Sequence, residues 1–174
     1  MLFRSHAVAY VTMALRVAWF KVHEPLAYYC AYFTVRGDGF DSSTMILPPE
    51  ESRRKIREIR NMDQPSARDK DIATCLELVL EMNLRGIRFL PVDLYKSDVR
   101  RFLIEDGNIR CPFISLPGLG ESAAIPIAEA RKDGPFLSIE DLQRRGKVGS
   151  SIVELLRAHG ALEGMSETNQ LSFF

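Results

Sequence analysis

The sequence predicts a mainly α-helical protein that carries one small β-hairpin insert. Apolar residues recur at helical spacing over most of the chain, and prolines and glycines separate these stretches. An Asp106-Gly107 pair between two short apolar runs is the typical signal of a two-residue hairpin turn. The 174 residues suffice for one ordinary domain or two small ones.

The composition argues against several classes of protein. The 23 basic and 23 acidic side chains cancel, so contact with a nucleic acid has to come from local geometry and not from a globally basic surface. The three cysteines (Cys30, Cys75 and Cys111) are widely spaced without a CxxC pair, and the histidines do not cluster with other ligand types. We therefore expect no disulfide framework, metal site or cofactor in this chain, and a reducing, cytoplasmic setting.

An apolar stretch near the N-terminus predicts the first helix, which Ser5 can cap and which runs to about Lys21. Arg16 interrupts this stretch, and its length falls short of the ~20 apolar residues that a membrane span needs. The helix is apolar nearly all round, so we expect it to be buried with neighbours on several sides. A chain that begins this way is expected to be a piece of a larger protein.

Two further helices have clear boundaries. Pro25 suits the first turn of a helix over residues 26–35, and the aromatic side chains of this helix, including Phe33, predict core packing. Apolar residues at helical spacing predict another helix over residues 67–84, with Gly86 as its C-terminal cap.

Between them lies a highly charged helix, predicted over residues 50–62. Ile56 and Ile59 form a thin apolar seam along it. Its basic side chains predict a solvated face, with a nucleic-acid-binding patch as the alternative.

The β insert follows the helix predicted over residues 67–84. Residues 87–95 are predicted to be extended, and Pro91 favours a strand at the edge of a sheet. Residues 100–105 and 108–112 are predicted to pair as a hairpin. From residue 113 to about residue 162 the chain is predicted to be helical again.

The most informative motif is Leu116-Pro117-Gly118-Leu119-Gly120, which is the hairpin of a helix-hairpin-helix motif. Its glycines permit a tight turn and a close approach of the backbone to another molecule. Backbone N–H groups at the start of the next helix, together with the helix dipole, favour an anion such as a DNA phosphate. Such a contact reads no base, so it predicts binding to duplex DNA of any sequence. The alternative is a plain helical corner without a ligand.

A second, weaker copy of the motif follows. Residues 141–145 read as a helix, residues 146–149 as a hairpin and residues 151–159 as the next helix. Its candidate phosphate contacts are Arg144, Arg145, Gly146 and Lys147, and a purely structural role is the equal alternative. Because basic and acidic residues balance over 116–160, we expect weak, salt-sensitive binding.

The chain ends in an apolar tip beyond a polar spacer. This tip predicts a short motif that docks into the pocket of a partner protein, with a tail folded back on its own core as the alternative. Gln170 and Ser172 are its polar members, and three apolar side chains are its anchors: Leu171, Phe173 and Phe174.

Several segments together resemble the C-terminal end of the PolC-type bacterial DNA polymerase III α subunit, in the order of that family. They span nearly the whole chain: Ser5-His6-Ala7-Val8-Ala9-Tyr10, Phe20-Lys21-Val22-His23-Glu24-Pro25-Leu26, Val92-Asp93-Leu94-Tyr95, the hairpin at 116–120, Phe136-Leu137-Ser138 with Glu140-Asp141-Leu142-Gln143, and the tail.

The resemblance implies a division of the chain into four parts. Residues 1–36 would be the end of the fingers region, with His6 and Tyr10 near the incoming nucleotide. Residues 37–89 would be a helical connector, and residues 90–163 the β-hairpin and a tandem helix-hairpin-helix domain that binds duplex DNA. The linker and tail, 164–174, would bind the β sliding clamp, although Phe173 replaces the leucine of the family motif.

The resemblance also implies what this chain lacks. No segment resembles the palm region, whose carboxylates would hold Mg²⁺, so we expect this chain alone to be inactive although the whole enzyme would be a DNA-directed DNA polymerase. The implied partners are duplex DNA, the β sliding clamp and the remainder of the polymerase, near the bacterial nucleoid. The alternative is an independent helix-hairpin-helix adaptor recruited to the clamp, for example in repair.

Overall fold

The computed structural model describes residues 2–36 and 40–168, with side chains from residue 7 onward. The fold is mainly helical with one small sheet, as predicted. Its elements in chain order are α1 (Leu2–His23), α2 (Pro25–Val35), α3 (Ser42–Met45), α4 (Pro49–Arg60), α5 (Ala67–Leu84), β1 (Phe89–Leu90), β2 (Leu103–Glu105), β3 (Asn108–Arg110), η2 (Phe113–Ser115), α6 (Glu121–Ala130), η3 (Arg131–Asp133), α7 (Ile139–Gly146) and α8 (Ser150–Ala158).

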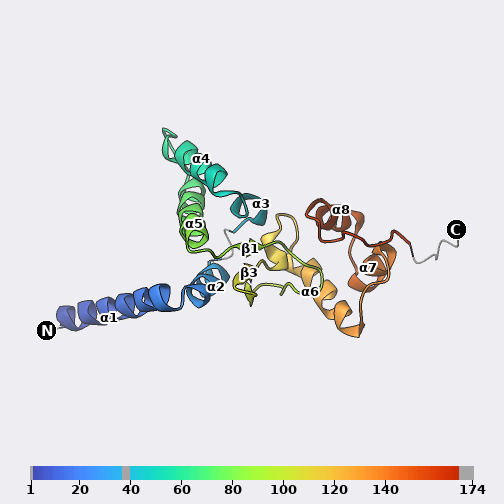
Figure 1. Cartoon of the computed structure of the whole chain (residues 1–174), viewed down its shortest axis with the longest axis horizontal. Helices are drawn as coiled ribbons and strands as arrows, with labels where there is room; N and C mark the ends of the chain where they lie inside the picture. The colour runs from blue at the N-terminus through green and yellow to red at the C-terminus, as the bar shows by residue number, and fades with distance from the viewer. Residues whose placement is uncertain (1, 37–39, 169–174) are drawn as a thin grey trace.

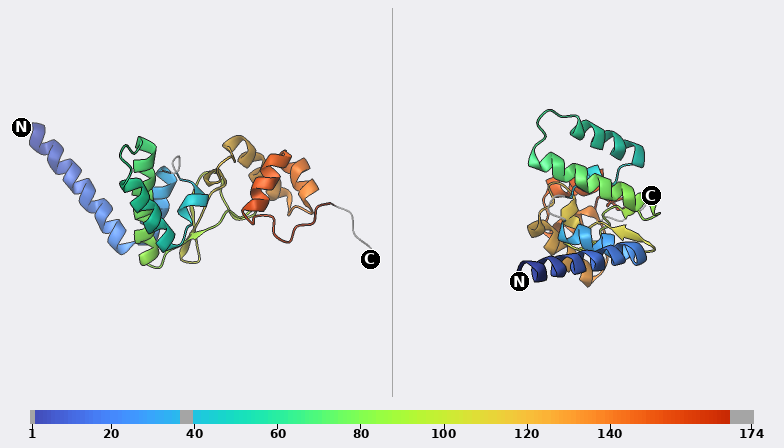
Figure 2. Two further views of the ribbon diagram at one scale, coloured as in Figure 1. Left: turned by 90° about the horizontal axis from the view of Figure 1, so that it is seen from above. Right: turned by 90° about the vertical axis from the view of Figure 1, so that its left-hand side faces the viewer.

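The molecule is elongated. Figure 1 shows α1 extending from one end, the α4–α5 pair beside the central sheet, and α6, α7 and α8 gathered at the other end. Figure 2 shows the same separation from above, with α1 pointing away from the rest of the chain. No helix in the described part of the chain is long and apolar enough to cross a membrane.

The prediction that α1 is buried was wrong. Every described side chain from Ala7 to Phe20 is exposed. The C-terminal end of α1 is held to α5, because Lys21 forms an ion pair of 2.7 Å with Glu81 and its carbonyl accepts a hydrogen bond from Arg85. The apolar side chains left open include Val8, Val11, Met13, Leu15, Val17, Trp19 and Phe20. A helix with this surface needs neighbours on several sides, and the described part of the chain leaves its side chains from Ala7 to Phe20 exposed.

The core begins at α2, where the predicted aromatic packing is confirmed. Tyr29 and Phe33 are fully buried, and the Phe33 ring lies 4.9 Å from the Phe89 ring and 5.6 Å from the Phe40 ring. One cluster of buried residues continues from here to Leu162. The core therefore crosses the predicted domain boundaries, which remain predictions.

Helices α4 and α5 pack as a pair. Ile56 and Ile59 are buried in the seam that the sequence predicted, and the basic side chains of α4 are exposed. Helix α5 has the predicted bounds. It begins with Ser66 and Asp69, whose side chains each bond the other residue's backbone N–H, which satisfies two free donors at the helix start.

The sheet has the strand order β1-β3-β2. Strands β2 and β3 are antiparallel across Asp106 and Gly107, which have the positive φ angles of 49° and 75° that a type I′ turn requires. Strand β1 is an edge strand parallel to β3, and Pro91 follows it directly. Both the predicted hairpin and the predicted edge strand are confirmed.

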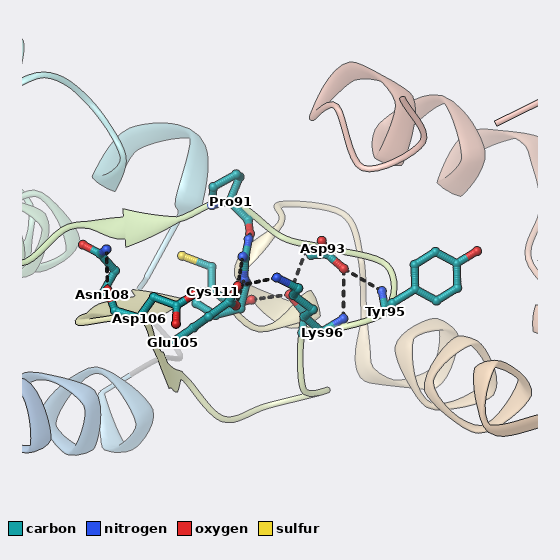
Figure 3. Close-up of polar contacts among 10 residues, drawn as sticks. Pro91, Asp93, Tyr95, Lys96, Glu105, Asp106, Asn108 and Cys111 are labelled. Atoms are coloured by element: carbon teal, nitrogen blue, oxygen red, sulfur yellow. Dashed lines mark hydrogen bonds and ion pairs between the residues drawn. The ribbon is translucent and has the colours of Figure 1, made fainter. Parts of the chain in front are cut away.

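The predicted strands at 87–95 and 100–105 were too long, because two aspartates turn the chain. The Asp93 carboxylate accepts hydrogen bonds from the backbone N–H groups of Tyr95 and Lys96, which ends the extended segment (Figure 3). The Asp98 carboxylate likewise accepts hydrogen bonds from the backbone N–H groups of Arg100 and Arg101, and β2 begins only after this turn.

A polar network holds the insert together. The Arg110 guanidinium donates to both carboxylate oxygens of Glu105, at 2.8 Å each, and to the carbonyl of Pro91. Lys96 lies 2.6 Å from the same carboxylate, and Figure 3 shows these two side chains pointing toward one another. The hydrogen bonds from Arg110 and Lys96 lower the pKa of Glu105 to about 2.

Candidate nucleic-acid interface

The first hairpin has two buried anchors and an exposed turn. Leu116 and Leu119 are each 2% exposed, whereas Pro117, Gly118 and Gly120 face solvent. The backbone N–H of Leu119 donates to the carbonyl of Leu116 at 3.0 Å and closes the turn. Gly118 has φ of 96°, a conformation that L side chains adopt only with strain. The motif thus exposes its two glycines, while Leu116 and Leu119 anchor the turn in the core.

Backbone donors gather where this hairpin enters α6. Gly120 is the N-cap residue, and its carbonyl accepts from the N–H groups of Ala123 and Ala124. The described part of the chain supplies no acceptor for the N–H groups of Gly120 and Glu121. These donors and the positive end of the helix dipole can hold an anion. Helix α6 continues through Pro126 without a break.

The second hairpin repeats this arrangement between α7 and α8, as predicted. Val148 is buried, while Lys147 and Gly149 on either side of it are exposed. Lys147 has a φ of 53°. Gly149 is the N-cap residue of α8, and its carbonyl accepts from the N–H of Ile152. Lys147 therefore stands at the turn with its side chain in solvent.

Gly146 belongs to the packing and not to the exposed turn. It is the last residue of α7 and is buried. A Cβ added here would lie 3.4 Å from side-chain atoms of Ile127 in α6 and Leu142 in α7, so this position packs against α6. The two hairpin motifs also contact each other. A Cβ added at Gly118 of the first motif would lie 3.8 Å from the Leu155 side chain of α8.

Arg145 is engaged within the fold, which the sequence did not indicate. Its guanidinium donates to the carbonyls of Ala130, Gly134 and Pro135 and to the Asp141 carboxylate, and lies 4.8 Å from the centre of the Phe136 ring. These partners occupy its donors and tie α7 to the connection from α6.

Its neighbour Arg144 remains open to solvent. It has a single ion pair of 2.7 Å, with Asp141, and 71% of its side chain is exposed. A backbone hydrogen bond from Leu137, assisted by Arg145 and Arg144, lowers the pKa of Asp141. Of the two arginines predicted at this hairpin, Arg144 has the more exposed side chain, with 71% against 23% for Arg145.

The predicted nucleotide-proximal residues lie far from both hairpins. His6 and Tyr10 are one turn apart on α1, at the opposite end of the molecule from α6, α7 and α8 (Figure 1). Tyr10 is 65% exposed, and the side chain of His6 is outside the described part of the structure.

The predicted clamp motif, Gln170 to Phe174, also lies outside the described residues. Two residues of the spacer before it, Ser166 and Glu167, are bonded to the rest of the fold. The carbonyls of Ser166 and Glu167 accept from the N–H groups of Ile139 and Glu140, at 2.9 and 3.1 Å. The Glu167 carboxylate also pairs with Arg157 at 2.7 Å. These contacts satisfy donors in the first turn of α7 that a helix leaves open.

The described residues contain no group of three or more His, Cys, Asp or Glu side chains that could hold a metal ion. The free thiols do not resemble reactive cysteines, because burial raises the pKa of the Cys30 thiol and raises that of Cys75 to about 11. The candidate binding site in the described part of the C-terminal half is therefore its pair of exposed hairpins, and not a metal site or a reactive cysteine.

Comparison with known proteins agrees with this geometry. The helix-hairpin-helix motif family matches residues 86–171. The chain is 48% identical over 171 residues to the DNA polymerase III PolC-type of Thermotoga petrophila and 50% identical over 173 residues to that of Bacillus subtilis. Each match covers 98% of this chain and 12% of the relative. Over nearly its whole length the chain is therefore similar to a segment of PolC-type DNA polymerase III, and its C-terminal half carries a helix-hairpin-helix motif.

Proposed function

We propose that this chain is the part of a replicative DNA polymerase that binds duplex DNA without sequence preference and tethers the enzyme to the β sliding clamp. The observation that carries the proposal is the exposed turn at Gly118 and Gly120, with open backbone donors at the start of α6. A phosphate accepts hydrogen bonds from such donors irrespective of the base attached to it.

The second hairpin adds side-chain contacts to this interface. Lys147 stands at the turn, and the Arg144 side chain is 71% exposed, so both can approach a phosphate. Arg145 supports this hairpin from within through its carbonyl partners. With few cations involved, the affinity is expected to be weak, and each phosphate that a cation neutralises adds to the slope with which it falls as salt rises.

Clamp binding would compensate for this weak affinity. A tail that docks Leu171, Phe173 and Phe174 into a clamp that encircles DNA raises the local concentration of the hairpins near the duplex. Because residues 166 and 167 are bonded to α7, only the few residues that follow would form the tether. A short tether gives a higher effective concentration than a long one when it can span the distance.

The rest of the polymerase would cover α1. Its exposed apolar surface needs neighbours, and the chain spans about 12% of the length of the relatives it matches. Tyr10 and His6 would then lie near the incoming nucleotide, and Mg²⁺ would be held by palm carboxylates outside this chain. We propose that the whole protein acts in the bacterial cytoplasm at the nucleoid, and that this chain alone does not polymerise DNA.

An independent clamp-recruited adaptor is the second candidate. The match to polymerase relatives includes α1, which an adaptor has no need of, and this favours the polymerase.

The hairpin is tested by replacing Gly118 with alanine. At φ of 96° an alanine strains the turn by roughly 1–2 kcal/mol and displaces the donors. Fluorescence anisotropy should show weaker binding to two duplexes of unrelated sequence, by the same factor. Gly86→Ala is the matched control, because Gly86 has a φ of 82°, open space around it and a position at the end of α5. Unchanged binding by Gly118→Ala would refute the proposal.

A further inference from the structure

Two adjacent arginines that the sequence did not single out precede β2, and one of them contacts the first residue of α6. The Arg100 guanidinium forms an ion pair of 2.5 Å with the carboxylate of Glu121, the first residue of α6. The Arg100 side chain is nevertheless 66% exposed. Arg101 is exposed as well, and no carboxylate in the described part of the chain pairs with it. One cation of the β insert, Arg100, therefore stands at the entry to α6, and the exposed Arg101 is its neighbour in the chain.

Hydrogen bonds fix the turn that carries these arginines. One carboxylate oxygen of Asp98 accepts from the backbone N–H groups of Arg100 and Arg101, at 2.8 Å each. The carbonyl of Asp98 accepts from Phe113 N–H at 2.9 Å, and the carbonyl of Val99 accepts from the next N–H of η2. Because η2 directly precedes the hairpin, the turn and the hairpin form one assembly.

The negative charge of Glu121 would repel a phosphate at the start of α6 unless a cation neutralised it. A carboxylate at the first position of a helix is favourable for the helix, but it has the same sign as a phosphate and stands beside the same donors. Arg100 neutralises it. A guanidinium carries five N–H donors, and the ion pair engages one terminal nitrogen, so other donors remain available on the exposed side.

We propose that Arg100 and Arg101 extend the duplex-DNA interface of the first hairpin. Arg100 screens Glu121 and donates to the phosphate that the hairpin holds, and Arg101 provides a second phosphate contact. The inference rests on the proposed DNA-binding function and adds to it residues from the β insert, far in sequence from the glycine turn.

The test is a salt series of anisotropy titrations with a duplex DNA. Arg100→Gln and Arg101→Gln should each weaken binding about two- to fivefold, and each should lower the slope of log affinity against log salt by about one. Glu121→Gln should tighten binding by a similar factor, because it removes the competing charge and releases Arg100. The urea midpoints should stay close to that of the unaltered chain, since an ion pair this exposed adds little stability.

Arg60→Gln is the matched control. Arg60 lies on α4, pairs with Glu77 at 2.5 Å and is 65% exposed, so this substitution removes the same charge from an equivalent ion pair away from the hairpins. Its DNA affinity should remain that of the unaltered chain. An equal loss in Arg60→Gln and Arg100→Gln would overturn the inference, because general charge and not position would then govern binding. Weaker binding by Glu121→Gln would overturn the screening role.

Gly118→Ala, measured in the same series, separates the two proposals. Undiminished binding by Gly118→Ala would refute the hairpin site itself. A loss in Gly118→Ala with unchanged affinity in Arg100→Gln and Arg101→Gln would refute only the role of the arginines.

Discussion

Arg144 and Arg145 are adjacent basic residues at the second hairpin, yet their replacement by methionine is expected to have opposite consequences. Arg145→Met should destabilise the fold, because its guanidinium holds three backbone carbonyls of the α6–α7 connection. Arg144→Met should leave stability nearly unchanged and weaken DNA binding, because its side chain is exposed. Methionine retains most of the apolar stem in both cases, so the comparison isolates the guanidinium group.

The magnitudes follow from the partners of each side chain. A hydrogen bond from a charged donor contributes about 1.5–3 kcal/mol when it is buried, and Arg145 donates to several acceptors with its side chain 23% exposed. Because water can replace some of these bonds, we expect Arg145→Met to lower the free energy of unfolding by about 2–4 kcal/mol. Arg144 forms an ion pair with the buried Asp141, but its own side chain is 71% exposed and Asp141 retains Arg145, so we expect a loss of about 0–1 kcal/mol.

Urea unfolding followed by far-UV circular dichroism measures the first effect, and anisotropy with duplex DNA well below the unfolding midpoint measures the second. Arg144→Met should bind DNA about two- to fivefold more weakly with a reduced salt slope. Arg145→Lys is the informative companion, because it retains the charge but lacks the fork that reaches several carbonyls. Equal stability of Arg144→Met and Arg145→Met would refute this assignment of roles.

Two further predictions concern the β insert and the tail. Arg110 and Lys96 lower the pKa of Glu105 from its ordinary value of 4.5 to about 2, so this carboxylate stabilises the insert above pH 4.5 and the stabilisation is lost as the pH falls toward 2. Glu105→Gln should flatten the dependence of the urea midpoint on pH in this window, and an undiminished dependence would contradict the network. At the tail, Leu171→Ala combined with Phe173→Ala should abolish binding to a β clamp in calorimetry, whereas Ser166→Ala should retain it. Clamp binding that survives the double substitution would rule out the motif.

Features set by neighbouring residues could be predicted from the sequence. The turn at Asp106 and Gly107 follows from residues that tolerate positive φ, and α5 follows from its apolar spacing and from the glycine at its end. The tight, exposed turn at Gly118 and Gly120 follows from the two glycines of the motif. In each case the information lies within a few residues of the structure that it determines.

Features that depend on distant partners could not be predicted. The burial of α1 depends on neighbours that this chain does not supply. Arg145 turns inward because carbonyls ten to fifteen residues away accept its donors, and carbonyls leave no signal in the sequence. The docking of residues 166 and 167 on α7 is likewise a contact between backbone groups. Arg100 reaches the hairpin because Asp98 turns the chain, which shortens the predicted strand.

The central claim is that backbone donors at the first hairpin hold a phosphate of duplex DNA. Amide NMR of the ¹⁵N-labelled chain, titrated with two short duplexes of unrelated sequence, tests it directly. The account predicts that the N–H signals of Gly118, Gly120 and Glu121 shift with both duplexes and return when salt is raised. Signals that stay unmoved there, while those of α4 shift, would contradict it.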